Sequence, residues 1–462
     1  MSDVVITNPY LAGNRAPVTE EVTAFDLPVA GTIPEELEGR WLRNGPNPLP
    51  GSVDPTKHHW FMGDGMVHGV RLRGGKAEWY RNRYLRSTPV AEAMGEDPVD
   101  GPRFGGRDFG PNTNVGGWAG KTWAMVEAGG TPMTMTYELD TVAFDDFSGT
   151  LPAAFSAHPK FDPVNRELHA MTYCWPDLMD HVQYVVVGDD GLVKRVVDIP
   201  VSDMIMLHDM SLTSRYAVVY DLPVTVDIEL AMQERFPFKW NPEREARVGL
   251  LPRDGEAADI IWAPVEPCYV FHPMNAYDTD DGKVVLDVCR YDKMFDQDLL
   301  GPFGDSLATL DRWTVDPVAG TVNEERISDR YQEFPRHNDA VGGQPYTWGY
   351  SAGVNRMDLD PADEAFGQTF KINVDTGDLQ VHDHGDGRGG AEPLFIPREN
   401  AASEDDGWIM VLVHDATTDG SDLVILDAQD MGGAEVARIS LPQRVPDGFH
   451  GNWVRDSSVA PD

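Results

Sequence analysis

The chain has 462 residues, 41% of them hydrophobic, which is enough to build a large buried core. Its 76 acidic and 37 basic residues give a formal net charge of −39 at pH 7. Such a charge repels the phosphates of nucleic acids and of anionic membranes. Nucleic acid is therefore excluded as a partner, and the acidity is interpreted as a source of solubility.

Signals for export, membrane insertion and disulfide bonding are missing from the sequence. The first ten residues show no basic segment followed by an apolar run. No stretch of about 18 uncharged apolar residues, the length needed to cross a membrane, occurs. Cys174, Cys268 and Cys289 are too few and too scattered for a disulfide framework, and we expect them to be reduced and buried. Together these features predict a cytoplasmic protein.

Short apolar runs rich in β-branched residues recur along the chain, with turn-forming residues between them. This alternation predicts mostly antiparallel β-strands. Helical periodicity is scarce, and one short helix is expected at residues 227–235. Expected strands include residues 216–220, 284–288, 408–413 and 423–426, with turns at 189–191, 316–320 and 375–377.

An all-β chain of this length suits a closed barrel or a propeller better than one sandwich. No repeat of the WD type is evident, so the number of blades does not follow from the pattern alone. No linker is evident either, and residues 1–462 are expected to form a single domain. The loosest stretch, residues 383–390, is expected to be a surface loop.

Four histidines share a distinctive frame, with apolar neighbours on one side and a polar or turn-forming residue on the other. They are His158, His208, His272 and His450, and 50, 64 and 178 residues separate them in turn. No local metal-binding motif spans such distances, so a closed, many-stranded fold must bring them together, each at the end of a different strand. Four neutral imidazoles leave the charge of a divalent cation intact and can leave coordination positions open.

The other nine histidines lack this frame and are expected at the surface or in hydrogen bonds within the core. His382 and His384 form a His-x-His pair that could bind metal on a strand, but their Asp- and Gly-rich setting favours an exposed loop. The remaining seven are His58, His59, His68, His169, His181, His337 and His414.

The residues around the four histidines, together with several further motifs, resemble those of the carotenoid cleavage oxygenase family. That family also contains retinoid isomerases and stilbene-cleaving dioxygenases. The resemblance covers nearly the whole chain, with the motifs in family order. The further motifs are Leu42-Arg-Asn-Gly-Pro-Asn-Pro, Trp60-Phe-Met-Gly-Asp-Gly-Met-Val-His, Gly110-Pro-Asn-Thr-Asn-Val, Met125-Val-Glu-Ala-Gly-Gly-Thr-Pro, Glu333-Phe-Pro-Arg, Glu392-Pro-Leu-Phe-Ile-Pro and Glu404-Asp-Asp-Gly.

The resemblance implies a seven-bladed β-propeller with a metal on its central axis and with loops and short helices capping one face. It implies that the metal is Fe(II) and that the four framed histidines are its ligands. Thr113 matches a threonine whose methyl group lies near a vacant coordination position, although a threonine between two asparagines is also an ordinary turn residue.

By the same resemblance, Glu127, Glu333 and Glu392 match carboxylates that accept hydrogen bonds from ligand histidines. A ligating imidazole needs an acceptor for its second N–H, because that bond fixes its tautomer and orientation. Three carboxylates serve four histidines, which leaves one histidine, most simply His158, to water or another group.

The reaction implied by the resemblance is oxidative cleavage of one conjugated C=C bond into two carbonyl products. The expected partners are O₂ and a small apolar polyene, a carotenoid or apocarotenoid, held in an apolar tunnel. Stilbene-cleaving relatives carry a lysine directly before the first carboxylate, where this chain has Val126, so a phenolic stilbene is the less favoured substrate. Isomerohydrolase chemistry and a metal-bearing propeller without catalysis also remain open, as does the oligomeric state.

An apolar group follows the expected helix and could lie beside the tunnel mouth. It consists of Leu230-Ala-Met, Phe236, Phe238 and Trp240, and charged residues flank it on both sides. An amphipathic helix packed on the core would give the same pattern. We therefore expect at most weak contact with a membrane.

Overall fold

In the computed structural model, residues 8–354 and 366–461 are described, and most of their regular structure is β-strand. The first seven residues, part of the segment that showed no export signal, lie outside the described residues. In the described part of the chain the α-helices are two short ones, α1 (Thr88–Met94) and α2 (Ile228–Met232). No helix there combines the length and the apolar character needed to cross a membrane.

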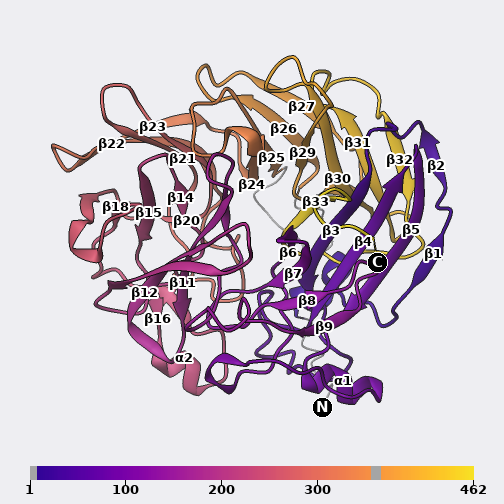
Figure 1. The fold of residues 1–462 in the computed structure, drawn as a ribbon, viewed down its shortest axis with the longest axis horizontal. Coiled ribbons are helices and arrows are strands. Elements are labelled where there is room, and N and C mark those ends of the chain that lie inside the picture. The colour runs from indigo at the N-terminus through magenta and orange to yellow at the C-terminus, as the bar shows by residue number, and fades with distance from the viewer. Residues whose placement is uncertain (1–7, 355–365, 462) are drawn as a thin grey trace, which may run out of the picture.

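Seven antiparallel sheets are arranged around a common centre, so the chain forms a seven-bladed β-propeller, as expected (Figure 1). We number the blades in chain order. The colour in Figure 1 passes once around the ring, and the yellow C-terminal strands return beside the indigo N-terminal ones. Blades 2 and 3 consist of β6 (Asn114–Trp118), β7 (Lys121–Met125), β8 (Met133–Met135), β9 (Thr141–Phe144) and of β10 (Lys160–Asp162), β11 (Glu167–Cys174), β12 (Leu178–Val187), β13 (Val193–Pro200).

The next three blades follow the same up-and-down order. Blade 4 contains β14 (Ser211–Leu212), β15 (Tyr216–Asp221), β18 (Arg247–Pro252) and β19 (Ile261–Pro264), and the hairpin of β16 (Val224–Val226) and β17 (Phe238–Trp240) leaves it. Blade 5 contains β20 (Tyr269–Asp278), β21 (Val284–Tyr291), β22 (Thr309–Asp316) and β23 (Thr321–Ser328). Blade 6 contains β24 (Gln332–His337), β25 (Trp348–Gly353), β26 (Gln368–Asn373) and β27 (Leu379–Asp383).

Blades 1 and 7 close the ring by sharing strands from both ends of the chain. Strand β33 (Gly451–Arg455) pairs with β3 as the inner strand of blade 1, and β2 (Val29–Gly31) pairs with β32 on the outside of blade 7. The remaining strands are β1 (Thr23–Phe25), β3 (Gly39–Pro46), β4 (Gly65–Arg73), β5 (Lys76–Tyr84) in blade 1 and β28 (Arg388–Gly390), β29 (Leu394–Pro397), β30 (Gly407–Asp415), β31 (Gly420–Asp427), β32 (Ala437–Ser440) in blade 7.

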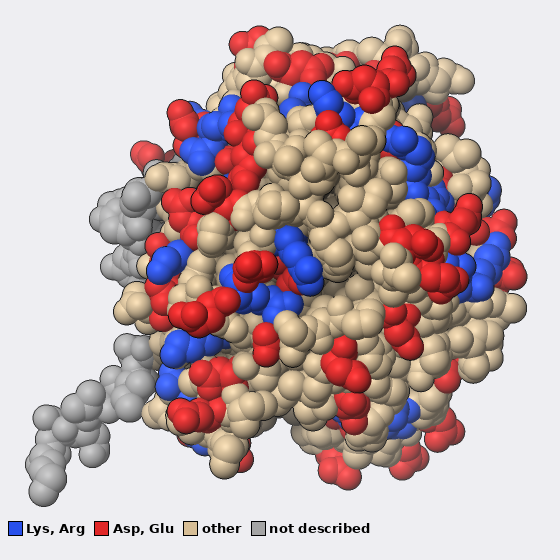
Figure 2. Space-filling model, turned by 90° about the vertical axis from the view of Figure 1, so that its left-hand side faces the viewer, with Lys and Arg blue, Asp and Glu red and all other residues tan. Residues whose placement is uncertain are grey.

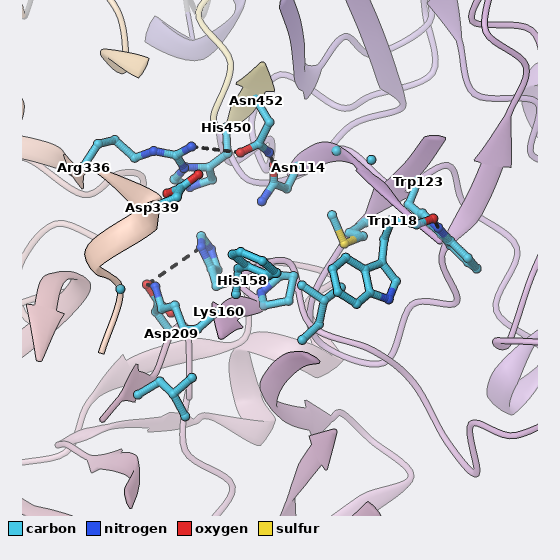
Figure 3. A pocket seen from close by; sticks show the side chains of 18 of the residues that line it. Asn114, Trp118, Trp123, His158, Lys160, Asp209, Arg336, Asp339, His450 and Asn452 are labelled. Carbon is cyan, nitrogen blue, oxygen red and sulfur yellow. Dashed lines mark hydrogen bonds and ion pairs between the residues drawn. The ribbon is translucent and has the colours of Figure 1, made fainter. Parts of the chain in front are cut away.

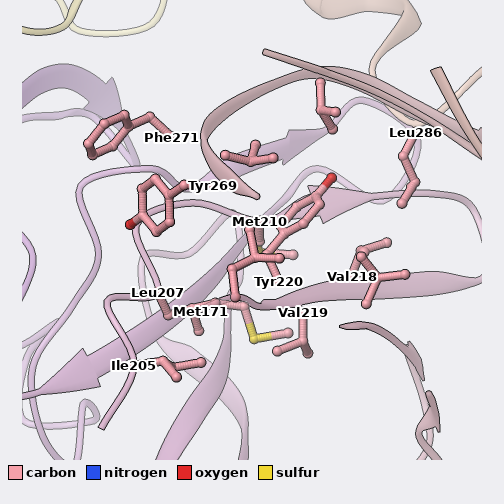
Figure 4. Packing of buried hydrophobic residues seen from close by; sticks show 14 of the residues in the cluster. Met171, Ile205, Leu207, Met210, Val218, Val219, Tyr220, Tyr269, Phe271 and Leu286 are labelled. Carbon is pink, nitrogen blue, oxygen red and sulfur yellow. The ribbon is translucent and has the colours of Figure 1, made fainter. Parts of the chain in front are cut away.

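The hydrophobic core lies between the faces of neighbouring blades. One large cluster joins blades 3, 4 and 5 through side chains such as Met171, Val218 and Leu286 (Figure 4). Burial of such side chains contributes about 1.5–3 kcal/mol each. The three cysteines are free and buried, as expected. The face in Figure 2 carries acidic side chains scattered among basic ones, which fits a solvating role for the acidity.

The predicted local elements agree with the structure except in one loop. The four expected strands lie in β15, β21, β30 and β31, and the expected helix is α2, with Asp227 as its N-cap. The prediction that His382 and His384 lie in an exposed loop is wrong, because both are buried. His382 is on β27, its Nδ1 lies 3.1 Å from the Met431 carbonyl oxygen, and His384 Nε2 lies 2.9 Å from Thr369 Oγ1.

Candidate metal centre

The four framed histidines lie within or just before the inner strands of four different blades. His158 lies two residues before β10, His208 three residues before β14, and His450 directly before β33. These three fit the expected position at a strand end. His272 differs, because it lies inside β20, where the pairing with β21 shifts register between Val270 and Pro273. Such an irregularity re-aims a side chain, and here it allows a residue inside a strand to face the axis.

The four imidazoles meet in a buried cluster. One ring nitrogen of each lies within 4.8 Å of the corresponding nitrogen of every other, and His208 Nε2 is 3.1 Å from His272 Nε2. Each histidine is at most 8% exposed. A ring nitrogen from each of four blades therefore faces one small volume, which has the size of a metal coordination sphere.

Three of the imidazoles contact a carboxylate through Nδ1. His208 Nδ1 lies 2.9 Å from Glu127 Oε1, His272 Nδ1 lies 2.6 Å from Glu333 Oε2, and His450 Nδ1 lies 2.9 Å from Glu392 Oε1. Each carboxylate accepts a hydrogen bond from the Nδ1–H group, so the lone pair of Nε2 is left free to face the cluster. This is the arrangement in which histidine binds metals.

Burial favours the neutral imidazole of two members of the cluster, His158 and His450, and the neutral form is the one that binds a metal. Burial lowers the pKa of His450 to about 3 despite the nearby Glu392. Burial and the neighbouring imidazoles hold the pKa of His158 well below its usual range. His272 is the exception: burial opposes its protonation, but the Glu333 carboxylate outweighs burial and raises its pKa.

His158 and Thr113 occupy special positions at the cluster. In the described part of the chain, His158 has no glutamate partner, and its Nε2 is buried without a hydrogen bond. A buried, unpartnered acceptor that faces three other imidazoles fits a metal ligand. Thr113 directly precedes β6, the inner strand of blade 2, and its carbonyl oxygen accepts a hydrogen bond of 3.0 Å from the amide of His450. Its role beside a vacant position stays a prediction.

A cavity of about 800 Å³ reaches the cluster along the axis (Figure 3). It is lined by residues that follow the histidines on the inner strands, such as Lys160 and Asn452, and by Asp209, Arg336 and Asp339. These charged groups do not match the apolar tunnel expected for the substrate. The lining is mixed, because tryptophan, phenylalanine and methionine side chains lie beside the charged ones, and we call this cavity the axial channel.

Aromatic side chains surround part of the histidine cluster. Two of them, Phe271 and Phe449, directly precede His272 and His450 in the sequence. The ring of Phe271 is 5.0 Å from that of His208, and Phe61 packs edge-on against both Phe271 and Phe449. The ring of Phe334 lies 5.5 Å from His272 and 5.4 Å from His450. Phe271, backed by Phe61 and Phe449, thus covers one side of the cluster, whereas Phe334 also lines the axial channel into which the cluster opens.

Three polar residues of the site, Arg336, Asp209 and Lys160, were assigned no function from the sequence. Arg336 lies 3.5 Å from Glu392 Oε1 and donates a 2.8 Å hydrogen bond to Asn452 Oδ1. Burial raises the pKa of Glu392, but Arg336 and His450 outweigh burial and lower this pKa to about 2. Asp209 and Lys160 form an ion pair beside His158. Each lies next to or within a recognised motif, so proximity to the motif was the available signal.

A second group with metal-like spacing is already occupied by an arginine. Asp162, Glu167 and His169 bring their polar atoms within 4.8 Å of one another. Arg253 forms an ion pair with Asp162, and its NH2 group lies 2.9 Å from His169 Nε2. The positive charge that this group needs is therefore supplied by the protein.

Glu333→Gln is expected to weaken metal binding or to lower the rate by roughly 10- to 100-fold. Glutamine keeps the size of the side chain but removes its charge, and the amide of Phe334, which also donates to Glu333, loses an acceptor if the NH₂ group faces it. Metal affinity and turnover test this. Glu325→Gln on the exposed edge of β23 is the control, and an unchanged affinity together with an unchanged rate for Glu333→Gln would contradict the assignment.

The fold and the histidine cluster agree with the comparisons to known proteins. The family described as RPE65, retinal pigment epithelial membrane protein, matches residues 15–455. A carotenoid cleavage oxygenase of Mycobacterium tuberculosis is 45% identical, over 96% of this chain and 97% of the relative. The structure of cobalt-substituted Synechocystis ACO is similar with a TM-score of 0.84 at 27% identity, covering 95% of this chain and 97% of that one.

The similarity extends to a dioxygenase that is named for a stilbene and not for a carotenoid. The lignostilbene dioxygenase of Pseudomonas brassicacearum has a TM-score of 0.85 at 29% identity, covering 96% of this chain and 98% of that one. A fold shared by both proteins does not distinguish their substrates. The match over nearly the whole length, together with the seven blades and the four converging histidines, shows that this chain belongs to the RPE65 and carotenoid cleavage oxygenase family.

Proposed function

We propose that this protein is an Fe(II)- and O₂-dependent dioxygenase that cleaves one conjugated C=C bond of a carotenoid or apocarotenoid into two carbonyl products. The observation that carries the proposal is the buried cluster of four imidazoles, three of which contact a glutamate. Four neutral nitrogen donors without a thiolate suit Fe(II), and also zinc, by ligand type. The choice of iron rests on the family.

Bound Fe(II) would supply the redox chemistry by which O₂ reacts with an electron-rich double bond. His158, His208, His272 and His450 would hold it, and Glu127, Glu333 and Glu392 orient three of these imidazoles. The aromatic rings around Phe61 and Phe271 exclude water from one side of the centre and offer a surface on which a flat polyene packs.

The choice of a polyene over a phenolic stilbene rests on two observations. Val126, which precedes Glu127, is buried and offers no charge to a phenol oxygen. Burying that oxygen without a partner is unfavourable, whereas a polyene gains roughly 0.8 kcal/mol for each buried CH₂-sized group. The carotenoid cleavage oxygenase that is 45% identical points the same way. The similarity to a lignostilbene dioxygenase keeps stilbene cleavage as the second candidate.

Contact with a membrane should be weak under this proposal. Leu230, Phe236, Phe238 and Trp240 are buried, so they belong to the core and not to a membrane-binding face. Ile228 and Met232 of α2 are exposed, beside the charged Glu229 and Glu234. An apocarotenoid delivered from solution or micelles suits such a surface. A cytoplasmic location stays a prediction from the sequence.

One assay tests the metal and the substrate together. Purified protein is expected to carry about one iron per chain and to lose turnover on chelation, because the four imidazoles are its only proposed ligands. An apocarotenoid and a hydroxystilbene are compared at equal concentration, with carbonyl products identified by mass. Faster cleavage of the hydroxystilbene would favour the second candidate. Full activity with zinc alone would contradict the redox role, and no cleavage by the iron-loaded protein would favour a non-catalytic propeller.

A further inference from the structure

We propose that Asp209, anchored by Lys160, positions the imidazole of His158 for metal binding, as the three glutamates do for the other histidines. Asp209 is thus a positioning residue and not a metal ligand. This inference rests on the proposed function, because it concerns the same four-histidine set.

The imidazole of His158 is oriented so that one ring nitrogen faces the metal cluster and the other faces Asp209. Its Nε2 is buried without a hydrogen bond and belongs to the converging cluster. Its Nδ1 lies 3.9 Å from Asp209 Oδ2. That separation is longer than a hydrogen bond, so Asp209 acts on the Nδ1–H through its charge. The geometry is a looser form of the His–Glu pairs.

Asp209 itself is held firmly. It is 4% exposed, its Oδ1 accepts a 2.6 Å hydrogen bond from the amide of Met210, and its Oδ2 accepts a 2.7 Å hydrogen bond from Lys160 Nζ. A buried carboxylate requires such partners, because an unpaired charge in the interior is costly. The two donors fix both oxygens, so Oδ2 stays directed at His158.

The ion pair also joins two of the ligand-bearing segments. Lys160 begins β10, two residues after His158, and Asp209 directly follows His208. Strands β10 and β14, which these segments enter, are neighbours at the axis. The Lys160–Asp209 pair therefore fixes the spacing between the His158 and His208 imidazoles, whose ring centroids are 4.3 Å apart. Figure 3 shows Lys160 and Asp209 beside His158 at the wall of the axial channel.

The test is a titration of the full, metal-free chain with Co²⁺, whose visible absorption reports the number and geometry of its ligands. Asp209→Asn is expected to bind Co²⁺ about 10-fold more weakly than the wild type and to change the absorption bands, because the neutral amide no longer orients the Nδ1–H. Lys160→Met is expected to weaken Co²⁺ binding as well. Lys160→Arg keeps the positive charge and is expected to bind Co²⁺ as the wild type does. Circular dichroism checks that each variant is folded.

Asp162→Asn is the matched control. Asp162 is a buried carboxylate on β10, the strand that Lys160 begins. It is paired with Arg253 and accepts backbone amides, but it is not in the four-histidine cluster. An Asp209→Asn variant with wild-type affinity and spectrum would overturn the inference. An equal change in Asp162→Asn would also overturn it, since general loosening of β10 would then explain both.

A further variant separates this inference from the proposed function. His158→Ala removes the imidazole itself and is expected to weaken Co²⁺ binding more than Asp209→Asn does. If wild-type protein binds no Co²⁺, or if His158→Ala binds it as the wild type does, the proposed metal set fails and this inference fails with it. If His158→Ala loses affinity and Asp209→Asn does not, only the role of Asp209 is wrong.

Discussion

Replacement of His272 by alanine is expected to remove the bound metal and to lower cleavage further than the Glu333→Gln variant does, below about one hundredth of the wild-type rate. The substitution deletes one of four ligands and also leaves the Glu333 carboxylate buried without its imidazole partner. Removing one member of a buried charged pair costs about 3–5 kcal/mol. Metal content and turnover are measured on the same sample.

His68→Ala provides the control for this variant. His68 is also buried, and its Nδ1 lies 2.9 Å from the hydroxyl of Tyr80, outside the four-histidine cluster. We expect it to lose some stability and to keep its metal. Wild-type iron content and rate in His272→Ala would show that His272 is not a ligand.

Gly451→Ala is expected to destabilise the protein by about 3 kcal/mol or more and to weaken metal binding at the same time. A Cβ atom at Gly451 would lie 2.0 Å from the carbonyl oxygen of Leu42, which is backbone of the paired strand β3. Strand β33 would have to move away from β3, and it would carry the adjacent His450 with it. Thermal denaturation and metal affinity measure the two effects.

Gly432→Ala is the matched control, because a Cβ atom there would meet nothing within 4 Å. It is expected to change stability by less than about 0.5 kcal/mol. A Gly451→Ala variant that melts like the wild type would mean that β33 can shift without cost, and the proposed link between strand pairing and the metal centre would be wrong.

Local pattern was sufficient to predict the four expected strands, in β15, β21, β30 and β31, and the short helix α2. The four histidines became a specific set only through the family resemblance. The blade number came only from the family resemblance, since no repeat marks the blades. The burial of His382 and His384 was missed because composition suggested a loop, whereas strand alternation on β27 and contact with residues 369 and 431 decide the exposure.

The site was predicted less completely than the fold, for a similar reason. Asp209 and Arg336 lie beside recognised residues in the sequence, but their effect depends on partners 49 to 116 residues away, Lys160 and Asn452. The axial channel could not be foreseen, because its lining comes from inner strands of several blades. Such long-range juxtapositions are fixed by strand pairing and not by local pattern.

The strand exchange between blades 1 and 7 sets an order of events during synthesis. Blades 2 to 6 are each made of consecutive segments and can form as the chain emerges, but blade 1 lacks its inner strand until β33 is complete. His450, the last of the four histidines, arrives with that strand. A chain that stops short of His450 and β33 therefore has an open ring and three of the four imidazoles, so possession of the complete metal centre marks a chain translated through β33.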